Sequence, residues 1–182
     1  MKTAQHVIAF ARVPSPLGAL LLAASEQGLC GLWFEEQKHL PPWLPAEWND
    51  SPPSHPVLQA AAQQLAGYFS GARETFELPL DLRHGTEFQC AVWQAMVDIP
   101  MRGSLSYGTL ARQIGRPAAV RAVGAAVGRN PIGIIVPCHR VMGADGSLTG
   151  YAGGLWRKTA LLRLEQGAHA PVPVGTTNDL FS

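Results

Sequence analysis

The side chains best suited to chemistry stand together in one short run, Pro137-Cys138-His139-Arg140-Val141. A thiolate is the strongest common nucleophile in proteins at neutral pH, and cationic neighbours favour it over the thiol. The histidine and the arginine of this run give Cys138 such neighbours. Cys30 and Cys90, by contrast, lie within apolar segments with no adjacent histidine, as inert packing cysteines do. Cys138 is therefore the candidate reactive thiol.

A thiol nucleophile needs a base, and the base needs a third group that fixes its tautomer. His139 is the candidate base, and Glu165, at the end of the last predicted helix, is the candidate orienting group. Adjacent residues of a strand point to opposite faces, so we expect His139 to reach Cys138 through a water or through a local kink at Pro137. A cysteine–histidine pair also suits a cysteine hydrolase, which these residues alone leave open.

Cysteine usage and hydropathy limit the class of protein. The chain has three cysteines, an odd number without framework spacing, which favours reduced thiols and a cytoplasmic location over disulfides. We expect no metal site, because there is no CxxC and no Cys/His cluster with ligand spacing. No stretch approaches the ~18–20 apolar residues that span a bilayer, so no membrane partner is expected.

The first 85 residues are predicted to form a strand-rich α/β domain. Apolar runs bounded by turn residues indicate an antiparallel meander, and apolar residues at helical spacing indicate one helix after a proline-rich loop. The expected elements are strands at His6–Val13, Ala19–Ala24 and Leu29–Phe34, a loop over 38–56, a helix at Val57–Phe69 and a short strand at Phe76–Leu82.

A change of charge near residues 83–86 indicates a domain boundary, and residues 86–167 are predicted to form a second, mainly helical domain with a helix-turn-helix. We expect the polar, proline-rich tail, residues 168–182, to be disordered. The fold class is thus α/β. The expected elements are a helix capped by Thr86 and ended by Pro100, a helix starting at Ser106, a third helix from about Ala118 to Gly128, a strand at Ile132–Val136, a turn at Gly143–Ser147 and a helix at Leu155–Glu165.

Charge is unevenly divided between the two halves. Residues 1–85 carry five basic and eight acidic side chains, whereas residues 86–182 carry nine basic and five acidic ones. All nine of these bases lie between Arg102 and Arg163, against a single acid, Asp145. Such a half is typical of a polyanion-binding surface. A solvated basic surface without a partner has the same composition, so charge alone leaves both open.

The third predicted helix has an unusual distribution of side chains. Val120, Val123 and Val127 share one side and are expected to pack inward. A helix that reads the major groove needs several polar side chains on its outer face, whereas small residues let the backbone approach DNA closely without sequence preference. The alternative to DNA binding is that the outer face of this helix packs against another protein helix. The outer face holds Arg121, Gly124, Ala125 and Gly128.

Together these motifs resemble one family. The run from Asn130 to Val141 is similar to the active-site signature of the O6-alkylguanine-DNA alkyltransferases, also called methylated-DNA–protein-cysteine methyltransferases. The resemblance is close over residues 86–167 and looser over the meander from Pro16 to Phe34. Further matching segments are Ser106-Tyr107-Gly108, Arg121-Ala122-Val123-Gly124, Gly150-Tyr151-Ala152-Gly153-Gly154 and Leu161-Leu162-Arg163-Leu164-Glu165.

The resemblance implies DNA repair by direct reversal of damage. Cys138 would take the alkyl group from O6-alkylguanine, and from O4-alkylthymine, in a nucleotide flipped out of the duplex. His139 would act as base through a water, with Glu165 orienting it, and Asn130 would hold the turn before the active site. Arg121 would fill the gap left in the base stack. The remaining residues implied in DNA or substrate binding are Tyr107, which would rotate the nucleotide and stabilise the departing guanine, and Ala122, Gly124, Ala125, Gly128, Val141, Tyr151 and Ala152.

The family also implies a winged helix-turn-helix, no cofactor and a single use of each molecule, because a thioether is a poor leaving group. The expected partner is double-stranded DNA containing alkylated bases, bound with little sequence preference by a chain that is monomeric in solution and able to assemble cooperatively on DNA. Some members have serine where this chain has Ala152, so the backbone N–H there would contact guanine alone. A lesion-sensing DNA-binding protein without transfer activity is the alternative function.

Overall fold

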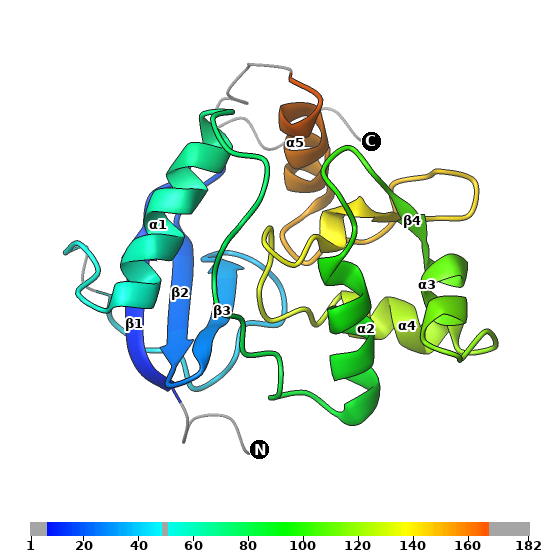
Figure 1. The fold of residues 1–182 in the computed structure, drawn as a ribbon, viewed down its shortest axis with the longest axis horizontal. Coiled ribbons are helices and arrows are strands. Elements are labelled where there is room, and N and C mark those ends of the chain that lie inside the picture. Colours follow the sequence, from blue (N-terminus) through cyan, green and yellow to red (C-terminus); the bar gives the residue numbers. More distant parts are fainter. Residues whose placement is uncertain (1–6, 49–50, 168–182) are drawn as a thin grey trace.

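The computed structural model describes residues 7–48 and 51–167 of the 182-residue chain. Three antiparallel strands, β1 (Val7–Val13), β2 (Leu20–Ser25) and β3 (Gly28–Phe34), form a sheet in the order β1-β2-β3. Helix α1 (Pro56–Phe69) packs across one face of this sheet (Figure 1). The predicted meander and first helix are confirmed, whereas the prediction for residues 168–182 lies outside the described residues.

The strand predicted at Phe76–Leu82 is wrong. Within this segment Leu80 forms an isolated bridge with Leu29 of β3, where Leu29 N donates to Pro79 O and Asp81 N donates to Leu29 O, both at 2.8 Å. Pro79 has no N–H to donate, so it interrupts a strand ladder. The pairing therefore stops after one bridge.

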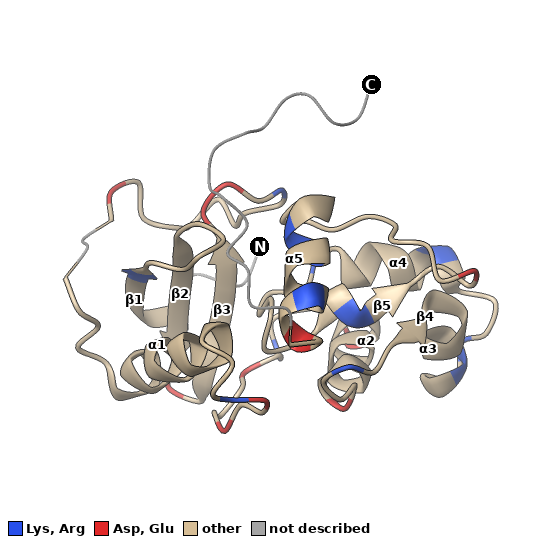
Figure 2. Cartoon of the chain, turned by 90° about the horizontal axis from the view of Figure 1, so that it is seen from above, with Lys and Arg blue, Asp and Glu red and all other residues tan. Residues whose placement is uncertain are grey.

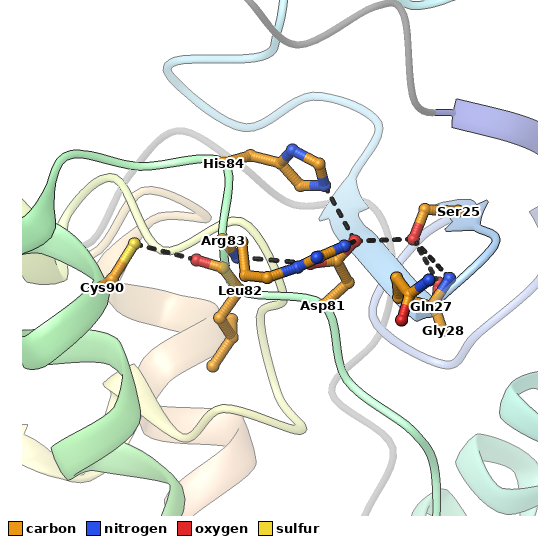
Figure 3. Close-up of polar contacts among 8 residues, drawn as sticks. All are labelled: Ser25, Gln27, Gly28, Asp81, Leu82, Arg83, His84 and Cys90. Carbon is orange, nitrogen blue, oxygen red and sulfur yellow. Dashed lines mark hydrogen bonds and ion pairs between the residues drawn. The ribbon is translucent and has the colours of Figure 1, made fainter.

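A buried carboxylate fastens the segment that leads into the second half of the chain (Figure 3). Asp81 accepts hydrogen bonds from Ser25 Oγ at 2.7 Å and from Arg83 Nε at 2.8 Å. The hydrogen bonds from Arg83 hold the pKa of Asp81 well below its ordinary value. Cys90 donates its thiol proton to the Leu82 carbonyl at 3.1 Å. The start of the second half is thereby attached to the turn between β2 and β3.

The second half is mainly helical, as predicted. Helix α2 (Glu87–Val97) starts with a capping box, in which Thr86 Oγ1 accepts from Gln89 N and the Gln89 side chain accepts from Thr86 N. Trp93 Nε1 donates to the Ala126 carbonyl at 2.8 Å and so joins α2 to the helix Val120–Val127, α4. The elements after α2 are β4 (Leu105–Ser106), α3 (Tyr107–Gln113), α4 (Val120–Val127), the 3-10 helix η2 (Cys138–Arg140), β5 (Val141–Met142), which pairs in parallel with β4, and α5 (Leu155–Glu165).

The strand predicted at Ile132–Val136 is also wrong. These residues form turns, in which Val136 N donates back to Ile132 O at 3.0 Å. Ile134 has a φ of 68°, a left-handed conformation that a strand excludes. Cys138 consequently follows a series of turns and begins η2, so the alternation of strand faces does not govern how Cys138 and His139 point.

Helix α5 lies between the two halves of the molecule (Figures 1 and 2). Arg157 of α5 donates through Nε to the Leu17 carbonyl at 2.9 Å, and its guanidinium stacks over the Phe34 ring at 4.5 Å. Two residues before Phe34 in β3, Leu32 forms a bridge with Ile132 of the second half. Figure 2 shows that the lysine and arginine residues gather in the second half, as the charge distribution of the sequence predicts.

Candidate active site

Cys138 lies at the first position of η2, and its side chain is buried, with 8% exposure. It borders a cavity of about 20 Å³. Residues from three places surround this cavity: the segment after β3, the end of α4 with the turns that follow it, and the loop before α5. The other lining residues are Gln37, Val127, Gly128, Asn130, Gly133, Gly150, Tyr151, Ala152 and Gly153.

His139 and Glu165 form a buried pair in which Nε2 lies 2.6 Å from Oε1. An ionised carboxylate can only accept a hydrogen bond, so Nε2 carries the proton and Nδ1 of the neutral ring keeps its lone pair. Nδ1 is buried and makes no hydrogen bond with any residue that the structure describes. Burial lowers the pKa of His139, although Glu165 opposes this shift. Nδ1 is therefore an available proton acceptor.

Glu165 is held by several donors at once. Besides His139, its Oε1 accepts from the Tyr68 hydroxyl at 2.8 Å and from Arg140 Nη2 at 2.8 Å, and its Oε2 accepts from Arg140 Nε at 3.0 Å. Burial by itself would raise the pKa of Glu165, but the hydrogen bonds from His139 and Arg140 lower it to about 2. The carboxylate is thus ionised and fixed in direction.

The sequence suggested that His139 and Arg140 supply the positive charge that favours the thiolate, but the structure assigns this charge to another residue. Arg140 is bound to Glu165, and the cation acting on Cys138 is Lys158, a fully buried side chain of α5. Burial raises the pKa of the Cys138 thiol, while Asn130, Lys158 and backbone N–H groups oppose that rise. The resting thiol therefore needs a base, and Lys158 is placed to stabilise the thiolate once it forms.

Asn130 spans the turns that lead to Cys138. Its Nδ2 donates to the Val136 carbonyl at 2.7 Å, and its Oδ1 accepts from Ile132 N at 3.0 Å. Both bonds are buried, so the amide takes the place of water for two backbone groups. Asn130 thus fixes the path of residues 130–136, which end beside Cys138.

Only some of the residues expected to bind the substrate line the cavity beside Cys138. Tyr151 and Ala152 line the cavity with Cys138, and burial raises the pKa of Tyr151 well above its ordinary value. Tyr107 begins α3, and its hydroxyl donates to the Thr149 carbonyl at 3.3 Å. Val141 is fully buried in β5 and is not among the residues that line the cavity.

The outer face of α4 exposes Arg121, Ala122 and Ala125. Gly124 lies under the Tyr107 ring, since a Cβ built there would be 3.8 Å from Tyr107 Cδ1. The expectation that Val120 packs inward is wrong, because α4 begins at that residue, later than predicted, and leaves its side chain 41% exposed.

Gly128 ends α4 as its C-cap and lines the cavity beside Cys138. Arg121, Ala122 and Ala125 thus form an exposed part of the outer face of α4, and the end of this helix reaches the candidate active site.

Two family models match the chain over most of its length. The model for the 6-O-methylguanine DNA methyltransferase, ribonuclease-like domain, matches residues 8–82, and that for the 6-O-methylguanine DNA methyltransferase, DNA binding domain, matches residues 87–167. The chain belongs to the 6-O-methylguanine DNA methyltransferase family.

Curated members of this methyltransferase family match nearly end to end. A methylated-DNA–protein-cysteine methyltransferase of Mycolicibacterium paratuberculosis is 47% identical over 165 residues, which are 91% of this chain and 96% of that relative. One from Methanosarcina barkeri is 47% identical over 154 residues, 85% of this chain and 94% of that relative. The resemblance inferred from the motifs is therefore confirmed.

Solved structures of the methyltransferase family share the fold. The crystal structure of Mycobacterium tuberculosis OGT in complex with DNA matches with a TM-score of 0.77 at 46% identity, covering 88% of this chain and 94% of that one. An O6-methylguanine-DNA methyltransferase from Pyrococcus kodakaraensis has a TM-score of 0.51 at 18% identity, covering 86% and 97%. The predicted α/β class, with an antiparallel sheet followed by a helical DNA-binding domain, is confirmed.

Sequence reasoning missed two members of the site, Tyr68 and Lys158. Lys158 had a readable signal, because Lys158, Leu161 and Glu165 recur at helical spacing and so share one face of α5, all three of them buried. Tyr68 had none, since it lies 97 residues from Glu165 in the sequence. The structure places Tyr68 on the buried face of α1, and no local pattern of the sequence identifies its partner.

Across residues 7–48 and 51–167, no group of three or more His, Cys, Asp or Glu side chains is placed to hold a metal ion. Over the same residues, no helix is both long and apolar enough to cross a membrane.

Proposed function

We propose that this chain repairs alkylated DNA by moving the alkyl group from O6 of guanine to Sγ of Cys138, once per molecule. One observation carries the proposal: His139 Nδ1 is buried, keeps its lone pair and is aligned by Glu165 next to a buried cysteine. Membership of the methyltransferase family supports the same chemistry. O4-alkylthymine is a second expected substrate.

The proposed alkyl transfer needs no cofactor, because side chains and a water supply every group that reacts. His139 Nδ1 takes the thiol proton through a water, and the Cys138 thiolate attacks the alkyl carbon as the carbon–O6 bond breaks. The electron pair of that bond stays on the purine, and N1 takes up one proton, which balances the proton that His139 removed from the thiol. Unmodified guanine thus remains in the DNA. Lys158 stabilises the thiolate, and the Tyr107 hydroxyl stabilises the departing base. The thioether that remains is a poor leaving group, so the protein is used once.

The substrate base must leave its duplex to be repaired. Cys138 is buried, and bases inside a stack cannot reach such an atom, so the nucleotide is flipped out. The small residues of α4, Ala122, Gly124, Ala125 and Gly128, give the backbone close access to a groove, and Arg121 is the side chain long enough to fill the emptied position. Binding of this kind depends on salt and little on sequence.

The cavity beside Cys138 must widen when the base enters. Its volume is about 20 Å³, whereas pockets for small molecules usually measure roughly 300–1,000 Å³. We propose that the loop carrying Tyr151 and Ala152 moves outward to admit guanine. The Ala152 N–H then contacts the base, because alanine has no hydroxyl to do so.

The proposed function also concerns how the chain is divided into domains and whether it assembles. We propose two domains, residues 1–85 and 86–167, with the boundary between the two matched family regions. The second domain carries the helix-turn-helix and Cys138, and the first supports it. We further propose a monomer in solution that assembles cooperatively along DNA, which sedimentation with and without duplex tests.

Transfer of a labelled alkyl group tests the function. Duplex DNA carrying O6-methylguanine labelled in its methyl group is mixed with the protein, and label should move to protein and saturate at one per chain. Cys138→Ser should abolish the transfer. Cys90→Ser is the matched control and should retain it, because Cys90 donates to the Leu82 carbonyl away from the site.

The alternatives give different results in the same assay. Tight binding of lesion DNA without movement of label would indicate a lesion sensor. Repeated turnover of an ester or a peptide would indicate a cysteine hydrolase, and the exposed small-residue face of α4 would then have no use. Saturation at one label per chain contradicts both.

A further inference from the structure

A side chain from the N-terminal half enters the hydrogen-bond network of the active site. Tyr68, in the last turn of α1, is 1% exposed, and its hydroxyl lies 2.8 Å from Glu165 Oε1. The same oxygen lies 2.6 Å from His139 Nε2. One oxygen atom therefore connects α1 with the candidate base.

The direction of the Tyr68 hydrogen bond is fixed by the charges of its partners. The pKa of Glu165 is lowered to about 2, so the carboxylate accepts. Burial, followed by the charge of Glu165, raises the pKa of Tyr68 far above its ordinary value, so the phenol keeps its proton and donates. Tyr68 is thus the donor of this hydrogen bond, and Glu165 is the acceptor.

The ring of Tyr68 and its hydroxyl make different kinds of contact. The ring packs against Phe69 and Phe76, with centroids 5.3 and 5.4 Å away, and belongs to the main hydrophobic core. The hydroxyl, by contrast, reaches across to α5. A phenylalanine at this position keeps the packing and removes the hydrogen bond alone.

Each donor to Oε1 disperses the negative charge that holds the imidazole proton. The charged and titratable groups that face His139 are Glu165 and Lys158 from α5 and Arg140 from η2, with Cys138 beside it in the chain. Of these, Glu165 alone favours the imidazolium, and Arg140 and Lys158 oppose it. Removing the Tyr68 donor therefore strengthens the one group that favours imidazolium.

We propose that Tyr68 is a positioning residue for alkyl transfer, through which α1 fixes the Glu165 carboxylate on His139 and limits how strongly that carboxylate holds the imidazole proton. This inference rests on the proposed function of Cys138. It gives the N-terminal half a direct part in the chemistry, in addition to supporting the fold.

The pH dependence of Tyr68→Phe tests the inference. Because His139 must be neutral to accept the thiol proton, the transfer rate rises with pH through the imidazole titration. Without the Tyr68 donor, Glu165 stabilises the imidazolium more strongly, so the midpoint should move to higher pH by about half a unit or more. The rate on the high-pH plateau should change by less than about threefold.

Phe76→Leu is the matched control, because it loosens the packing around the Tyr68 ring and keeps the hydroxyl. Its midpoint should equal that of the unmodified protein. An unshifted midpoint in Tyr68→Phe overturns the inference, and so does an equal shift in both variants, since packing would then be the cause.

A second measurement separates this inference from the proposed function. The ring nitrogens of His139 are followed by NMR across the pH range in the unmodified protein and in Tyr68→Phe, without any DNA. The imidazole should titrate at higher pH in Tyr68→Phe. If the protein transfers no label but its His139 titration shifts in Tyr68→Phe, only the proposed function is contradicted. If the His139 titrations of the two proteins are identical, the role of Tyr68 is contradicted.

Discussion

Arg140 donates two hydrogen bonds to Glu165, from Nη2 to Oε1 at 2.8 Å and from Nε to Oε2 at 3.0 Å. Both side chains are buried. A buried carboxylate without a cation is costly, whereas a two-point guanidinium pair satisfies its lone pairs and fixes its plane. The orientation of His139, and with it the free Nδ1, depends on this pair.

Glu165 should make the stability of the protein depend on acid. Its pKa in the folded protein is about 2, against an ordinary value of 4.5. A depressed carboxyl pKa stabilises the fold above the ordinary value, and that contribution, on the order of 3 kcal/mol, is lost as the pH falls through the folded value. Urea unfolding of Glu165→Gln and the unmodified protein should differ most at neutral pH. The difference should shrink between pH 4.5 and 2, and a constant gap would contradict the prediction.

Lys158 should lower the pKa of the Cys138 thiol. Its ammonium donates to the carbonyls of Val141 at 2.7 Å and Thr149 at 3.0 Å, which holds it in place. Lys158→Gln removes the charge, so the reaction of Cys138 with iodoacetamide should slow, by about tenfold for each unit that the thiol pKa rises.

Arg163→Gln is the control for this experiment, because it removes the same charge from an exposed position of α5. It should leave the thiol rate unchanged. Cys30 should not compete for the reagent, since burial raises its pKa to about 12. Equal slowing in both lysine and arginine variants would mean that net charge, and not the position of Lys158, is responsible.

Arg121 should matter for duplex DNA and not for the chemistry. Arg121→Ala should slow repair of O6-methylguanine in duplex by on the order of tenfold, because flipping a base costs a few kcal/mol without a group to fill the stack. Reaction with the free base O6-benzylguanine should be unchanged. Arg116→Ala, also exposed and just before α4, removes the same charge and should leave the flipping step intact. Equal losses with duplex and free base would exclude a role for Arg121 in flipping.

Asp81 should contribute to stability without affecting transfer. Asp81→Asn weakens the hydrogen bonds that the buried Asp81 accepts from Ser25 and from the exposed Arg83 (Figure 3), so the free energy of unfolding should fall by about 1–3 kcal/mol. A double-mutant cycle with Ser25→Ala isolates the 2.7 Å bond between them. The single-turnover rate with saturating DNA should stay the same, and a large loss of rate would show that the attachment also positions Cys138.

The sequence by itself identified the candidate nucleophile, the candidate base and most of the helices. Cys138 and His139 are recognisable because they are neighbours in the chain, and α1 is recognisable because its apolar residues recur at helical spacing. The capping box at Thr86 is equally local. Such features depend on residues a few positions apart.

The tertiary structure decided what surrounds the thiol. Arg140 lies beside Cys138 in the sequence but pairs with Glu165, while the charge that acts on the thiol comes from Lys158 on another element. The turns at Ile132–Val136 replace an expected strand because Asn130 satisfies their backbone groups with its side chain. Tyr68 meets Glu165 across 97 residues of chain. No local pattern encodes such pairings, because they arise only when packing of the core brings distant elements together.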